Sequence, residues 1–299
     1  MSPLAQYMFM FLLNHTGPGN SVYSMELLPL CGFDKSSPAC DITPTCIADS
    51  PLCAPPRWSE YRSGWVRVET RESAAQRYKA AAESLVRTAT YLTRCTDEDG
   101  SVIEDCTPVR WPEGPQSAAC AMLASSIWES GYREDIMIGA PPAGRGPDGE
   151  ACVMQVMPQH IAANVSWLSE DQRLAMSTED IAKMVLGSDR DSLKRCYEAG
   201  GRMLAKFRAH AGATCKGTTW AYSMYSAYGT GGQCSPSTTR AALEKEKLET
   251  QGRVQIPVGD KDDQKPKTVD WAAQREKTYN TCMNRWPDGE KLQDWAEAI

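Results

Sequence analysis

The sequence predicts a mainly α-helical domain between an irregular, cysteine-rich N-terminal arm and a C-terminal helical tail. Three observations carry this prediction. Apolar residues recur at three- and four-residue steps through the middle of the chain, which is the period of an amphipathic helix. Proline and cysteine crowd the first 65 residues, and charged residues dominate after Arg240. We therefore divide the chain into an arm over 1–65, a helical domain over 66–240, and a charged linker with a final helix over 241–299.

The expected helices follow from the apolar period. The second of them, Gln116 to Tyr132, comes after a proline break. Its predicted buried stripe consists of Ala119, Met122, Leu123, Ser126 and Ile127. The other expected helices are 66–94, 170–186, 191–211, 218–228 and 269–286. A Gly/Pro-rich loop is expected over 139–149.

Twelve cysteines are the strongest signal in the composition. Their number is even, no pair has the Cys-x-x-Cys spacing of a zinc knuckle, and the three histidines form no metal-ligand pattern. We therefore expect disulfides formed in an oxidising compartment, with buried free thiols as the alternative, and neither a metal nor a cofactor. The two pairs we expect are Cys95–Cys106 and Cys215–Cys234. The acidic turn that Cys95 and Cys106 bracket lacks the spacing of a calcium-binding EF-hand loop.

Three short segments carry the functional signal. The first is Ser-Ile-Trp-Glu-Ser-Gly at 126–131, the second is Gly-Glu-Ala-Cys-Val-Met-Gln-Val-Met-Pro at 149–158, and the third is Trp-Ala-Tyr-Ser at 220–223, followed by glycines at 229–232. Together they resemble the soluble lytic transglycosylase family. That family has a Glu-Ser at a helix end, a Gly-Leu-Met-Gln-(Ile/Val)-Met-Pro segment, and an Ala-Tyr-Asn before glycines. The resemblance spans about residues 115 to 235.

Several positions depart from the family pattern. Ser223 stands where the family usually has Asn, Cys152 replaces a glycine, and Val153 replaces the common Leu. The segment 139–147 reads as an insertion. The third segment is therefore the loosest match, and Cys152 raises the question of whether the local backbone is altered.

The resemblance implies a lysozyme-like domain of the goose type that cuts peptidoglycan, with Glu129 as its catalytic acid. Taken alone, Glu129 would read as an exposed helix-terminal glutamate; the segment around Met154 reverses that interpretation. A carboxylic acid acts as a general acid near neutral pH only in surroundings that disfavour its charged form, and the small, apolar residues before Glu129, with Trp128, favour such a setting. The substrate-binding residues that the resemblance implies are Ser130, Met154, Gln155, Tyr222 and Tyr228.

Glycosidases commonly use two carboxylates, and no second one has a compelling position here. The nearby acidic residues, Glu134, Asp135, Asp148 and Glu150, lie in stretches that we expect to face solvent. This favours the one-carboxylate reaction of a lytic transglycosylase, which closes a 1,6-anhydro ring. A hydrolytic muramidase is the close alternative. A non-catalytic virion protein that keeps a lysozyme-like domain for binding is the second class.

The expected partners are peptidoglycan glycan strands. The net charge is −6, so the chain has no basic bias, and this argues against nucleic acid as a partner. The apolar run Pro3 to Leu13 is too short to span a bilayer and lacks the flanks of a secretory signal. An extracytoplasmic or virion-associated protein fits an oxidising space without an ordinary signal, and other virion or secretion-machine proteins would then be partners. An intracellular protein with reduced thiols also fits the missing signal.

Overall fold

The fold is described from a computed structural model of the 299-residue chain. The described residues are 1–16, 57–59, 64–66, 71–97, 100–104, 106–140, 145–146, 149–214, 218–230, 256–257, 266–267 and 271–284. Within this part, the chain is mainly α-helical, as the apolar period predicts.

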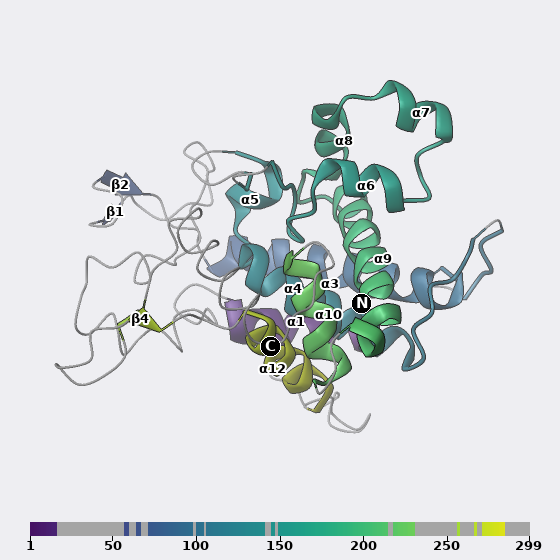
Figure 1. The fold of residues 1–299 in the computed structure, drawn as a ribbon. Coiled ribbons are helices and arrows are strands. Elements are labelled where there is room, and N and C mark those ends of the chain that lie inside the picture. Colours follow the sequence, from purple (N-terminus) through teal and green to yellow (C-terminus); the bar gives the residue numbers. More distant parts are fainter. Residues whose placement is uncertain are drawn as a thin grey trace.

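Other helices pack around the buried helix α4. Figure 1 shows α3, α4 and α10 at the centre of the molecule. The longer helices are α1 (Pro3–Thr16), α3 (Arg71–Arg94), α4 (Gly114–Ser130), α9 (Arg190–Thr214), α10 (Trp220–Thr230) and α12 (Trp271–Asn284). The shorter ones are α5 (Glu134–Ile138), α6 (Pro158–Asn164), α7 (Glu170–Ala175) and α8 (Thr178–Val185). Two antiparallel pairs of short strands are β1 (Arg57–Ser59) with β2 (Gly64–Val66), and β3 (Ile256–Pro257) with β4 (Pro266–Lys267).

Helix α4 is buried on nearly all sides. The five residues of the predicted buried stripe are buried, but so are most of the other residues of the helix. It packs against α3, α9 and α12, and its Ser117, Ser125 and Ser126 are as buried as its apolar residues. The physical reason is size: Ala and Ser side chains let neighbouring helices approach from several directions, so there is no solvent face to mark with charge. Glu129, near the end of α4, is one of the few residues of this helix that keep some exposure.

A glycine pair in α9 allows the close contact of that helix with its neighbours. A Cβ added at Gly201 would lie 2.6 Å from Leu92 Cδ1 of α3 and 2.7 Å from Met122 Sδ of α4. Both distances are shorter than any ordinary Cβ contact, so a larger residue would force the Leu92 and Met122 side chains to shift in a closely packed core.

Both flanking regions contribute a helix to this core. Helix α1, from the predicted arm, packs on α3 and buries Met8 and Leu12. Tyr7 Oη donates a hydrogen bond of 2.6 Å to the Cys282 carbonyl of α12. The remainder of the predicted arm and the linker lies largely outside the described residues. No helix in the described part of the chain is long and apolar enough to cross a membrane.

Helices α6, α7 and α8 lie together at the top of Figure 1. The segment expected as one helix over 170–186 is two, because Ser169 and Ser177 each cap a helix N-terminus and Met176 adopts an extended backbone between them. The Ser169 cap is a complete capping box with Gln172.

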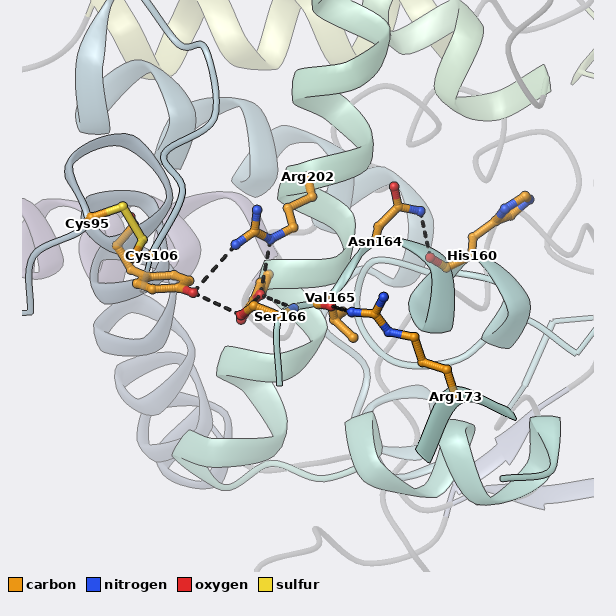
Figure 2. A network of polar contacts seen from close by, with 10 residues as sticks. Cys95, Cys106, His160, Asn164, Val165, Ser166, Arg173 and Arg202 are labelled. Carbon is orange, nitrogen blue, oxygen red and sulfur yellow. Dashed lines mark hydrogen bonds and ion pairs between the residues drawn. A yellow bond between two sulfur atoms is a disulfide. The ribbon is translucent and has the colours of Figure 1, made fainter. Parts of the chain in front are cut away.

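A polar network holds the chain after α6 against α3 and α9, and Figure 2 shows Ser166 and Arg202 at its centre. The buried Glu198 carboxylate accepts hydrogen bonds from Ser166 N at 2.9 Å, Ser166 Oγ at 2.7 Å and Arg202 Nε at 3.1 Å. Tyr91 Oη lies 2.9 Å from Ser166 Oγ. The Glu198 charge is therefore paired and hydrogen-bonded, as a buried carboxylate requires.

Three disulfides form among the described residues. Cys95–Cys106, which the sequence predicts, closes a short hairpin; Cys152–Cys196 ties the second motif segment to α9; and Cys120–Cys282 joins α4 to α12. The other predicted pair, Cys215–Cys234, lies outside the described residues.

We expect the Cys120–Cys282 bond to contribute most to stability, because it joins positions 162 residues apart. In the chain-entropy view, long loops gain most from closure. The double variant Cys120→Ser/Cys282→Ser should lose roughly 2–5 kcal/mol of unfolding free energy in urea titration. The matched control is Cys95→Ser/Cys106→Ser, whose separation is 11 residues, and it should lose less. An equal or smaller loss for the long-range pair would contradict the expectation.

Candidate functional site

Glu129 occupies the last turn of α4, one residue before the helix ends. Gly131 caps the helix in the left-handed conformation, with φ of 59°, and its N–H donates to the Ile127 carbonyl. The Glu129 side chain is 15% exposed, so it is neither sealed in the core nor free on the surface. A carboxylate in this position can meet a ligand that approaches the end of α4.

Two other helices fix the chain directly after Glu129. The carbonyl of Tyr132 accepts two hydrogen bonds from Arg77 of α3, at 3.1 Å from Nε and 2.8 Å from Nη2. The Tyr132 hydroxyl accepts one of 2.9 Å from Tyr197 of α9. Because Tyr132 is fully buried, these bonds hold the end of α4 rigidly. Rigid support is what a catalytic side chain needs.

The second motif segment forms a tight turn. Ala151 and Val156 exchange two backbone hydrogen bonds of 3.0 Å, and Gln155 N donates to the Cys152 carbonyl at 3.0 Å. Met157 is the N-cap of α6, and Pro158 takes the first helical position, where its missing N–H does no harm. The Met-Pro pair therefore ends the turn and starts a helix.

Backbone strain gathers at these two segments. Of the four non-glycine residues with positive φ in the described chain, three lie here: Tyr132 at 55°, Cys152 at 64° and Gln155 at 49°. Residues in the left-handed region cost free energy and often mark functional sites. Cys152 has a positive φ, a conformation that glycine adopts at little cost, and its disulfide to Cys196 helps to hold it there.

Gly200 of α9 allows the turn to lie close to the helix. A Cβ at Gly200 would be 3.0 Å from the Cβ of Met154. The whole of Met154 is buried, so neither its side chain nor its backbone faces solvent. Gln155 is partly exposed, and its Nε2 donates to the Cys152 carbonyl at 2.9 Å.

Tyr228 of α10 connects the turn with Glu129. Its hydroxyl donates a 2.8 Å hydrogen bond to the Met154 carbonyl. Burial raises the pKa of Tyr228 well above its ordinary value, and the nearby Glu129 carboxylate raises it further while Arg275 opposes this rise. Tyr228 is therefore a neutral donor that lies close to both Glu129 and the second segment.

Tyr222 and Ser130 have less direct roles in the geometry. Tyr222 is buried on α10, and its backbone N–H is capped by Thr219 Oγ1 at 3.1 Å. The buried Ser130 hydroxyl donates to the Ser126 carbonyl at 2.9 Å and accepts from Tyr132 N at 3.1 Å. Ser130 thus pairs with two backbone groups at the end of α4, and both of its hydrogen bonds are made within the protein.

The residue that the sequence does not indicate is Arg275. It lies on α12, is 3% exposed, and its Nη2 donates to Glu129 Oε1 in an ion pair. The neighbouring Trp128 donates from Nε1 to Thr278 Oγ1 of the same helix at 2.8 Å. The cysteine at 282, on this helix, is the sequence feature that could have hinted that the helix is joined to another part of the chain.

The described residues contain no group of three or more His, Cys, Asp or Glu side chains placed to hold a metal ion. Comparison of the chain with protein-family models, with curated proteins and with solved structures finds no match. The local geometry and the three motif segments therefore carry the functional argument.

We expect Tyr228→Phe to destabilise the protein by about 1–3 kcal/mol, because the buried Met154 carbonyl loses its side-chain donor. The matched control is Tyr225→Phe. Tyr225 is also fully buried on α10, but it donates at 3.2 Å to Ala121, a carbonyl within a helix. Urea unfolding of both variants measures the difference. A loss for Tyr228→Phe no larger than for the control would show that the bond to Met154 is dispensable.

Proposed function

We propose that the protein is a peptidoglycan lytic transglycosylase with a lysozyme-like helical domain, and that Glu129 is its catalytic acid and base. The best support is the position of Tyr228. Its hydroxyl donates to the Met154 carbonyl of the Met-Gln turn, and its ring lies within electrostatic range of the Glu129 carboxylate at the end of α4. Glu129 and Met154 belong to the first and second segments of the family resemblance, and Tyr228 lies between the two parts of the third.

The proposed reaction needs one carboxyl group. Glu129 gives its proton to the glycosidic oxygen between N-acetylmuramic acid and N-acetylglucosamine as the bond to the anomeric carbon breaks. The muramoyl 6-hydroxyl then attacks that carbon and returns its proton to the Glu129 carboxylate. The products are a 1,6-anhydro muramoyl end and a free N-acetylglucosamine hydroxyl. Glu129 is regenerated and no water is consumed.

The roles proposed for the other residues follow from their positions. The side chain of Gln155 and the backbone of its strained turn are placed to hold sugar amide groups. Tyr228 anchors that turn beside Glu129. Met154 and Ser130 support the site through the backbone, since their side chains are buried in contacts within the protein.

The proposed setting is outside the cytoplasm or on a phage particle, with glycan strands as partner and virion or secretion-machine proteins as further partners. The three disulfides support an oxidising environment. A particle-borne enzyme that opens the cell wall locally would combine these features.

A second candidate is a glycan-binding protein without turnover. In this candidate, the Arg275–Glu129 ion pair would keep the carboxylate occupied, so that it holds glycan without cleaving it. A hydrolytic muramidase is the other alternative to ring closure.

We expect Glu129→Gln to abolish the release of 1,6-anhydro muropeptides from purified sacculi, because an amide cannot donate the proton. Mass spectrometry of the digest measures the products. The matched control is Glu170→Gln, at an exposed first-turn position of α7, which should keep wild-type activity. Products with an ordinary reducing end would identify a hydrolase. Glycan binding by the wild-type protein without any cleavage would favour the second candidate.

A further inference from the structure

We infer that Arg275 is a positioning residue of the proposed reaction: it orients the Glu129 carboxyl group and stabilises the negative charge that develops there when the proton leaves. This rests on the proposed function, and it makes α12 a wall of the site. The argument begins with the contact itself. Arg275 is 3% exposed, and Glu129 is the acidic partner with which it pairs among the described residues.

The position of Arg275 is fixed by the rest of α12. Ala272, Arg275, Thr278, Tyr279 and Cys282 make up the buried face of the helix. Contacts along this face run down α4: Thr278 accepts from Trp128 at 2.8 Å, Tyr279 Oη lies 2.9 Å from Ser117 Oγ, and Cys282 is bonded to Cys120. These contacts fix the backbone of α12 beside the end of α4, and thereby the point from which the Arg275 side chain reaches Glu129.

The chemistry explains why a cation is useful here. The first step leaves a carboxylate on Glu129, and a fixed cation beside developing charge lowers the barrier to forming it. The second step needs that carboxylate turned toward the incoming hydroxyl proton, and an ion pair with a held guanidinium restricts its rotation. One interaction thus serves both steps.

Tyr228 on α10 is a second titratable side chain in electrostatic range of Glu129, and burial raises its pKa far enough that it stays neutral through the working pH range. Replacing Arg275 by a neutral residue therefore removes the cation that pairs with Glu129 and introduces no new charge.

The test compares Arg275→Met with wild-type protein on sacculi, with anhydro-muropeptide release as the readout. We expect kcat to fall roughly 10²-fold with little change in KM, the size of effect seen when one fixed donor is removed from a site of developing charge.

Arg275→Lys retains the charge but not the planar fork, so it should recover part of the lost rate. The matched control is Asn280→Ala, at an exposed position on the opposite side of α12, and it should behave as wild type. Thermal unfolding of each variant verifies that it is folded. If Arg275→Met does not fold, the lysine variant carries the test through its kcat and KM.

The outcomes separate the two proposals. A wild-type protein that yields no anhydro product overturns the proposed function and this inference with it. An active wild type with an unchanged kcat in Arg275→Met overturns the inference alone. A faster Arg275→Met variant also overturns it, because Arg275 would then block Glu129 rather than assist it.

Discussion

The packing of α12 along α4 is the contact on which the candidate site depends. It places a buried cation on the one acidic residue of α4's last turn, and a buried cation without a partner would cost several kcal/mol. The disulfide and the hydrogen bonds along the same face keep the two helices in register. The end of α4 is therefore defined as much by a helix near the C-terminus as by its own sequence.

The second segment shows how a residue other than glycine can hold a strained turn. Cys152 adopts the left-handed backbone that glycine permits easily. A disulfide to α9 supplies the constraint, and Gly200 on that helix supplies the space. The conformation of the turn is therefore held by a disulfide and by close packing against α9.

Sequence reasoning performed best where structure is set by local pattern. The helices ending near Arg94, Ala211 and Tyr228 and the Cys95–Cys106 pair follow from spacing of a few residues, and they are present. In α4 it identified five buried residues but not the burial of most of the others, because a helix of small residues that is covered from several directions has no polar face. It also merged α7 and α8, because the apolar period continues across the serine cap at Ser177.

The sequence by itself determined the helical class, the candidate acid Glu129 and the segments that accompany it, since each is encoded in neighbouring residues. Only the tertiary structure decided that Tyr228 joins the Met154 turn and that Arg275 pairs with Glu129 across 146 residues. The physical reason is that such contacts arise from how helices pack. Periodicity specifies which face of a helix is apolar, but it does not specify which distant helix will cover it.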